Sequence, residues 1–211
     1  MPRAPRATDS AQKARRREDI LTAARDLFRQ GPYPALTMAQ VAEAAGVAKG
    51  TLYLSFPTKE ALFLELLEAA YGAWFQAVAA GLPRVKGAPS LARLLTRTVL
   101  ETPDFMALAV LGPTVLEHNV DAERALAYKR ALLRGTAGLA KSLEARGLLK
   151  QGRGWHLLLR LHAMVLGLQP HAQPAPVVAA LLDRPELHPF RLDFAAELEA
   201  FLLDLLRGME H

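Results

Sequence analysis

The stretch TMAQVAEAAGVAKGTLYLSFPTKEAL, from Thr37 to Leu62, decides the fold. It predicts two short helices joined by a tight turn and followed by a third helix. Thr37 and Gln40 have the spacing of a capping box, which starts the first helix. Gly46 lies where that helix must end, at a position that needs a left-handed residue. Helix, glycine turn and helix at this spacing indicate a helix-turn-helix unit, whose second helix enters the major groove of DNA.

A longer helix follows the unit. Pro57 blocks extension of that helix upstream, and Thr58 is placed to cap it. Apolar residues continue at helical spacing to about residue 80, so this helix is long enough to leave the small unit and carry the chain into a second domain.

The net charge of +5 is carried by the first 17 residues. That segment holds six arginine and lysine residues and one aspartate, while the charges of the remaining chain sum to zero. A basic arm beside a DNA-reading unit can neutralise phosphates or follow a groove, and the alternative is a solvated, disordered leader. We expect residues 1–17 to form a basic flexible arm, with Arg16 and Arg17 among its contacts to DNA.

Composition excludes several classes of protein. The chain has no cysteine, which excludes disulfides, thiolate metal sites and thiol catalysis. No apolar run approaches the roughly 18 residues of a spanning helix, and the basic N-terminus lacks the apolar core of a secretory signal. We therefore expect a cytoplasmic protein with no membrane partner. Because no metalloprotease motif, phosphate loop or convergent catalytic group is found, we expect neither an enzyme nor a cofactor or metal.

The rest of the chain predicts an all-α fold, because helical periodicity dominates and no alternating strand is found. Thr102, Pro103 and Asp104 have the order of a helix start: a cap, a proline and an acid. The proline-rich residues 170–189 indicate an irregular connection that contains at most one short helix, over 177–182. Further helices are predicted over 18–30, from 90 onward, from 119 or 121 to about 147, over 154–169 and over 192–207.

These patterns resemble the DNA-binding head of TetR-type transcriptional regulators. The order is I-L-x-A-A-x-x-L-F, then T-x-x-x-V-A-x-x-A-G-V-x-K-G-T-L-Y-x-x-F, then P-T-K-E-A-L, and it covers roughly Arg17 to Leu67 almost without gaps. The remaining two thirds of the chain resemble the family only in helical architecture. The resemblance implies an all-helical homodimer, usually a repressor whose second domain binds a small molecule and thereby releases a DNA operator.

The resemblance also implies individual contacts to DNA. Gly50 lets the backbone approach the duplex, and Tyr53 and Lys59 resemble the family's phosphate-binding residues, Lys59 with help from a helix dipole. The alternatives are that Tyr53 packs half-buried and that Lys59 is merely solvated. The full set of expected contacts, besides the two arginines, is Thr37, Lys49, Gly50, Thr51, Tyr53, Leu54, Ser55 and Lys59.

Three positions depart from the family pattern. Ala48 replaces a polar residue that commonly begins the second helix, so one cap or phosphate bond is lost. Leu54 and Ser55 stand where an aromatic residue and a histidine are common. Leu54 offers apolar contact to a thymine methyl group, and Ser55 can still bond a phosphate.

The sequence of the second domain predicts a ligand cavity and a dimer surface. Large apolar residues with two histidines suit a mostly apolar or aromatic effector, and the strong alternative is that each apolar residue belongs to the ordinary core. The candidate ligand contacts are Phe105, Met106, His118, Tyr128, Trp155 and His162. The resemblance implies a four-helix dimer interface, which is typical of the family. The alternative is that one of these helix faces only closes the core of the monomer. The candidate dimer contacts are Ala163, Gly167, Phe194, Leu198, Phe201, Leu202 and Leu205.

Together these patterns predict three segments: the arm at 1–17, a DNA-binding domain at 18–65 with its motif at 37–56, and a ligand-binding and dimerisation domain at 66–211. The leading hypothesis is a homodimeric repressor released from a palindromic operator by a small apolar or aromatic effector. The alternatives are an activator, an effector-independent DNA binder, or a small-molecule sensor with a degraded DNA head.

Overall fold

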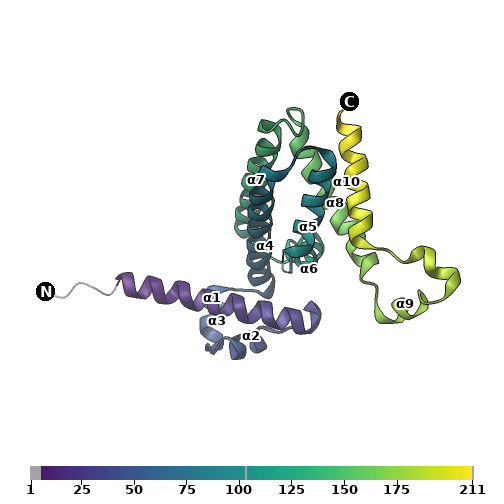
Figure 1. Cartoon of the computed structure of the whole chain (residues 1–211). Coiled ribbons are helices and arrows are strands. Elements are labelled where there is room, and N and C mark those ends of the chain that lie inside the picture. Colours follow the sequence, from purple (N-terminus) through teal and green to yellow (C-terminus); the bar gives the residue numbers. More distant parts are fainter. Residues whose placement is uncertain (1–5, 103, 211) are drawn as a thin grey trace.

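The computed structural model describes residues 6–102 and 104–210, and every regular element within them is helical. The N-terminal helices form a small head below an upright helical body (Figure 1). The head consists of α1 (Arg6–Gln30), the short turn η1 (Tyr33–Ala35), α2 (Met38–Ala44) and α3 (Lys49–Ser55). The helix-turn-helix unit is therefore α2, a turn and α3, and the prediction of an all-α fold with an N-terminal unit of this kind is confirmed.

The expectation of a loose arm over residues 1–17 is wrong for its larger part. Helix α1 begins at Arg6 and runs without interruption through the basic residues to Gln30. This segment contains no glycine or proline and is rich in alanine and arginine, which favour helix. The basic residues from Arg6 to Arg17 thus lie on one continuous helix. Residues 1–5, with Arg3, lie outside the described part of the chain.

Helix α4 (Lys59–Gly81) joins the head to the body. It begins beside α1 and rises through the body as one continuous helix (Figure 1). Thr58 caps it as predicted, because its side chain accepts a hydrogen bond of 3.0 Å from the backbone N–H of Ala61. Eleven of its 23 residues are buried, so α4 is the central column against which the rest of the body packs.

The body surrounds α4 with helices from the rest of the chain. Helices α5, α6 and α7 pack against α4, while α8 packs against α6, α7 and α10. Between α8 and α10 the chain makes an excursion through α9 and η4, in which no residue is buried. Figure 1 shows this excursion projecting away from the body. The remaining bounds are η2 (Leu82–Arg84), α5 (Ala88–Glu101), α6 (Phe105–Leu111), η3 (Gly112–Leu116), α7 (Ala122–Ala145), α8 (Arg153–Ala172), α9 (Pro176–Leu181), η4 (Pro185–Phe190) and α10 (Phe194–Glu210).

The start of α6 differs from the predicted helix start. Thr102 follows the last residue of α5, and Asp104 precedes α6 with a left-handed φ of 60° and no capping bond from its side chain. Its carboxylate instead accepts three hydrogen bonds of 2.7–3.1 Å from the guanidinium of Arg29, at the end of α1. A long-range ion pair therefore replaces the local cap.

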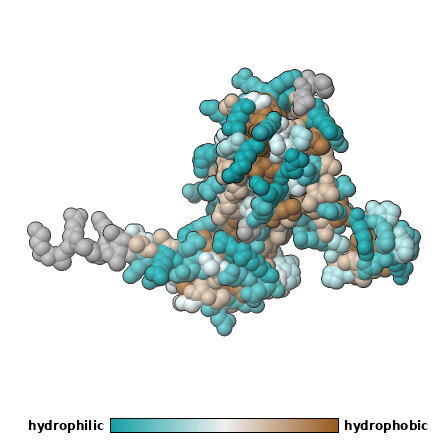
Figure 2. All heavy atoms as spheres, in the orientation of Figure 1, coloured by the Kyte–Doolittle hydropathy of each residue, from teal (hydrophilic) through white to brown (hydrophobic). Residues whose placement is uncertain are grey.

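Hydrophobic residues come to the surface along the body more than over the head (Figure 2). Within the described residues, no single helix is long and apolar enough to span a membrane. Helices α5 and α6, with η3, reach that apolar length only as a pair bent by 82°.

Candidate functional site

Helix α2 and its turn are held by the local bonds that the sequence predicts. The backbone N–H of Gln40 donates to Thr37 Oγ1 over 3.3 Å, and the Gln40 side chain accepts from the N–H of Thr37 over 2.8 Å. At the other end Gly46 has a φ of 64°. The N–H of Gly46 donates to the carbonyl of Glu43, and that of Val47 donates to the carbonyl of Ala42, which is the Schellman arrangement. These bonds set the angle at which α3 leaves α2.

Helix α3 presents Lys49, Tyr53 and Leu54 to solvent. It has no side-chain cap at Ala48, as the departure from the family pattern predicts. Lys49 is exposed, Tyr53 is 51% exposed and Leu54 is 90% exposed, so none of them is a core residue. A leucine at 90% exposure contributes almost no buried apolar surface to the fold. Apolar contact with a partner would bury that surface and favour binding. Thr51 and Ser55 are half-buried, and the Ser55 hydroxyl donates to the carbonyl of Thr51 over 3.2 Å.

Gly50 lies on the exposed face of α3. A Cβ atom placed on it would meet no atom of the chain within 4 Å. Because glycine weakens a helix relative to alanine, and nothing inside the protein requires its small size, the open space is suited to close approach by a partner's backbone. Thr37, at the start of α2, is exposed as well.

Lys59 differs from the expectation of a phosphate contact. Its ammonium group donates to the backbone carbonyls of Tyr33 and Leu36 over 3.0 and 2.8 Å. It also lies 4.1 Å from the centre of the Tyr33 ring, a cation–π contact. The lysine therefore ties the start of α4 to the η1 turn, where carbonyl groups at the end of the turn attract a cation.

Arg16 and Arg17, adjacent on α1, have different surroundings. Arg16 is exposed. Arg17 is half-buried, and its guanidinium donates to Glu65 and to the backbone carbonyl of Ser55. The sequence gives no sign of this difference, because Glu65 is 48 positions away.

The body contains a cavity of about 120 Å³ between α4, α5, α6, α7 and α8. This is far more than the roughly 10–15 Å³ that one water needs. The rings of Trp74 and Phe105 stack in its wall with centroids 5.4 Å apart, and Tyr71 meets Phe105 edge-on at 5.0 Å. Among the described residues, no acidic, lysine or arginine side chain lines it. The lining residues are Tyr71, Trp74, Phe75, Val99, Phe105, Leu132, Thr136, Trp155, Leu158, Leu159, Leu161, His162 and Val165.

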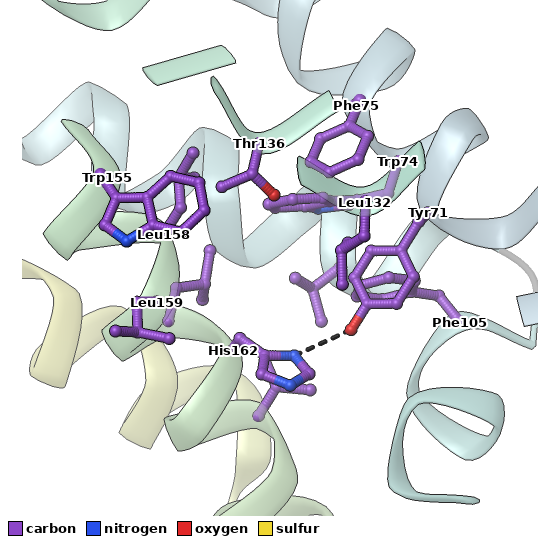
Figure 3. Close-up of a pocket in the computed structure, with 13 residues that line it drawn as sticks. Tyr71, Trp74, Phe75, Phe105, Leu132, Thr136, Trp155, Leu158, Leu159 and His162 are labelled. Carbon is purple, nitrogen blue, oxygen red and sulfur yellow. Dashed lines mark hydrogen bonds between the residues drawn. The ribbon is translucent and has the colours of Figure 1, made fainter. Parts of the chain in front are cut away.

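The cavity contains a small number of polar groups. The Tyr71 hydroxyl and His162 Nδ1 share a hydrogen bond of 2.8 Å across the space between α4 and α8 (Figure 3). Burial lowers the pKa of His162, with the Lys129 charge acting in the same direction and Glu117 opposing it. The ordinary pKa of a histidine, about 6.5, is already below 7. Because burial lowers it further, the imidazole of His162 is neutral at pH 7. The buried indole N–H of Trp74 has no hydrogen-bond partner in the described part of the chain.

The structure brings half of the expected ligand contacts together. Phe105, Trp155 and His162 line the cavity. The other three do not: Met106 and His118 lie outside it, His118 on the surface, and Tyr128 lines a neighbouring hollow. These three expectations are wrong for this cavity because Met106 and Tyr128 do not line it from their helices and His118 lies in the exposed turn between η3 and α7.

The contribution of α4 to the cavity was missed. Tyr71, Trp74 and Phe75 have i, i+3 and i+4 spacing, which places three aromatic rings on one side of a helix. That spacing is the signal that could have identified them.

Three of the expected dimer contacts lie inside the monomer. Phe194, Leu198 and Leu202 are buried where α10 packs against α5 and α8. The apolar stripe of α10 therefore closes the core of its own chain, and those expectations are wrong. Phe201 and Leu205 are half-buried. Ala163 and Gly167 lie on the outer face of α8, where Ala163 is exposed and Gly167 is surrounded by open space.

Two family models match the chain, one for each part. Residues 20–66 match the model described as bacterial regulatory proteins, tetR family. Residues 68–211 match the model described as tetracyclin repressor-like, C-terminal domain.

Individual relatives give the same picture. The chain is 35% identical over 82 residues to the HTH-type transcriptional repressor KstR2 of Rhodococcus jostii, a match that covers 37% of this chain and 40% of that protein. The chain thus spans well under two thirds of this relative's length. Among solved structures it is similar to Thermus thermophilus FadR in complex with lauroyl-CoA, with a TM-score of 0.58, 28% identity and coverage of 90% and 92% of the two chains. It is also similar in fold to FadR of Bacillus halodurans, with a TM-score of 0.60, 16% identity and full coverage of both chains.

Proposed function

The chain belongs to the TetR family of DNA-binding transcriptional regulators, and from this premise we propose that it is a homodimeric repressor that binds a palindromic operator. In this proposal a small effector, whose buried part is uncharged and largely apolar or aromatic, fills the cavity of the body and releases the DNA. The cavity is the observation that carries the release, because a concave site with apolar and aromatic walls and a few polar groups is the usual form of a small-molecule site.

The exposed face of α3 supports the DNA contacts. Leu54 would meet a thymine methyl group, Lys49 and Tyr53 would bond base edges or phosphates, and the backbone at Gly50 would approach the duplex. Thr37, Thr51 and Ser55 border this face and are proposed as further contacts to the DNA backbone.

The cavity lining supports the chemistry of the effector. Burying a charged ligand group against an uncharged lining is costly, so the buried part of the ligand is neutral. The Tyr71–His162 pair offers the ligand a polar contact at the wall of the cavity. The similar T. thermophilus FadR binds lauroyl-CoA, a molecule with such an apolar part. Lauroyl-CoA is therefore the first compound to test.

The dimer is supported by surfaces that the monomer leaves uncovered. Ala163 and Gly167 lie one turn apart on the outer face of α8, with open space around Gly167. The excursion through α9 and η4 adds Val177 and Phe190, each 71% exposed. Two copies are also what a palindromic operator requires, because two recognition helices must reach successive major grooves.

Selection of bound duplexes from a random pool, followed by sequencing, tests DNA recognition. We expect a palindrome with half-site centres about one helical turn apart or a multiple of that. Sequence-independent binding alone would contradict the proposal and favour a sensor with a degraded head.

A cavity-filling variant tests the effector site. Release of the selected duplex is measured with lauroyl-CoA, with free laurate and with small aromatic compounds. Thr136→Phe should keep DNA binding and lose release, because the added ring occupies the cavity that Thr136 lines. The control Leu133→Phe adds a ring at an exposed position of the same helix and should respond normally. Equal release from both variants would contradict a site in this cavity.

Sedimentation of two variants, each with one alanine replaced by glutamate, tests the dimer. Ala163→Glu places a charge in the proposed interface, and we expect it to shift the protein to monomer. Ala127→Glu makes the same change on the exposed face of α7 and should remain dimeric. A wild-type monomer at micromolar concentration would overturn the homodimer.

A further inference from the structure

We infer that Arg17 is a positioning residue that holds the recognition helix α3 at its C-terminal end, and that it does not act as a phosphate contact. This inference depends on the DNA-reading head, and neither the effector nor the dimer enters it.

The guanidinium of Arg17 joins three elements of the head. From α1 it donates through Nε and Nη2 to the two carboxylate oxygens of Glu65 on α4, the Nε bond being 2.8 Å long. Nη1 donates to the backbone carbonyl of Ser55, the last residue of α3, over 3.1 Å. Its central carbon lies 4.2 Å from the centre of the Phe56 ring, which is itself buried. The planar fork of arginine suits this combination, and lysine could not reproduce it.

Helix α3 needs such an attachment more than its neighbours do. It has only seven residues, and no side chain caps its start at Ala48. An isolated helix of this length is marginal in water, so its orientation depends on tertiary contacts. Its last carbonyl groups have no partner within the helix, and a cation near them is favourable. The bond to Ser55 therefore fixes the end of α3 opposite to the one that the α2 turn fixes.

The same contacts reduce the attraction of Arg17 for phosphate. Glu65 compensates its charge at hydrogen-bond distance, and the Arg17 side chain is only 41% exposed. A phosphate would have to compete with a two-oxygen pair that is already formed. Arg16, the next residue on α1, is exposed and offers the comparison that a test needs.

Alanine substitutions at the two arginines remove the same charge from adjacent positions. Binding of the duplex selected from the random pool, and of a scrambled duplex of equal composition, is measured over a range of salt concentrations. Arg17→Ala should weaken the selected duplex about tenfold, as the removal of a charged hydrogen bond implies. It should leave the scrambled duplex within about twofold and the salt slope unchanged. If Arg16 neutralises a phosphate, Arg16→Ala lowers both affinities together and reduces the slope by about 0.9 per phosphate.

Glu65→Gln separates the two roles of Arg17 by the sign of the effect. If Arg17 positions α3, weakening its partner lowers the ratio of selected to scrambled affinity. If Arg17 binds phosphate, releasing it from Glu65 raises both affinities and steepens the salt slope. Arg17→Lys keeps the charge and removes the fork, so it should behave like Arg17→Ala in the affinity ratio.

Full recovery in Arg17→Lys, or a slope change in Arg17→Ala with an unchanged affinity ratio, overturns the inference. Thermal unfolding of each variant accompanies the binding data, and if Arg17→Ala does not fold, Glu65→Gln and Arg17→Lys decide. If the wild type selects no duplex, the proposed operator fails, and the salt slopes of the two arginine variants still distinguish a phosphate contact from a positioning residue.

Discussion

The two glycines of the helix-turn-helix unit show how a single residue serves either the fold or the partner. Gly46 adopts a left-handed φ of 64° that ends α2, whereas Gly50 is helical and surrounded by open space. The first is required by the backbone of this chain. The second has no internal reason to be glycine, which leaves contact with the duplex as the reason that the geometry supports.

Alanine at each glycine should therefore have opposite effects on stability. Gly46→Ala should destabilise the fold by about 1–2 kcal/mol, because a side chain is strained in the left-handed region. Gly50→Ala should stabilise it by up to about 1 kcal/mol and weaken DNA binding, because alanine favours helix while its methyl group obstructs the duplex. Denaturant unfolding and DNA titration of both variants measure these effects. Tighter DNA binding by Gly50→Ala would contradict the assigned contact.

His162 should make stability depend on pH. Burial and the Lys129 charge lower its folded pKa below the ordinary 6.5, with only Glu117 opposing. Below pH 6.5 the unfolded chain therefore binds a proton that the folded chain refuses, so stability falls as the pH drops from 6.5 towards the folded pKa. His162→Gln removes this contribution. The stability of wild type relative to His162→Gln should be constant above about pH 6.5 and decline below it, and parallel curves from chemical unfolding at about pH 5–8 would exclude the effect.

At the scale of elements, the two short helices of the unit begin differently. Helix α2 has a complete capping box between Thr37 and Gln40, while α3 begins at Ala48 without a side-chain cap. The missing bond leaves α3 dependent on its turn, on its buried Leu52 and on the contact from α1 at its other end. The recognition helix is therefore stabilised from outside itself.

Restoring and removing a cap test this dependence. Ala48→Ser should stabilise the head by about 1 kcal/mol, because a serine hydroxyl can accept from the free N–H groups of the first turn. Thr37→Ala should destabilise it by about the same amount. Thermal unfolding of the two variants gives the comparison. No change in Ala48→Ser would mean that the orphan N–H groups of α3 are already satisfied.

At the scale of the whole molecule, one ion pair links the head to a wall of the cavity. Arg29 lies in the last turn of α1, and Asp104 directly precedes Phe105, which lines the cavity. The Asp104 side chain is only 13% exposed. Its backbone has a left-handed φ, which is uncommon for a residue other than glycine. Such strained positions persist where the surrounding structure fixes them, here through the three bonds to Arg29.

Breaking this pair should uncouple the effector from DNA. Asn tolerates the left-handed region, so Asp104→Asn keeps the turn and removes the ion pair. We expect the factor by which an effector lowers DNA affinity, typically about 5–150-fold, to shrink in this variant, while affinity without effector changes less. Glu101→Gln, which removes only an exposed pair with Arg97, serves as the control. An unchanged factor in Asp104→Asn would exclude this link as the route.

The features that sequence alone determined are local. The capping box, the glycine that ends α2, the cap of α4 and the missing cap of α3 each depend on residues within a few positions, whose steric and hydrogen-bonding preferences act wherever the segment lies. The helical character of the body follows in the same way from periodicity.

Only the tertiary structure decided which helix face meets which neighbour. Arg17 pairs with Glu65, Tyr71 meets His162 across 91 positions, and the stripe of α10 closes its own core. Periodicity identifies an apolar or basic face, but whether that face meets a cavity, a carboxylate or a second copy depends on how all the helices pack together. That packing depends on contacts between residues far apart in the chain, which no local pattern contains.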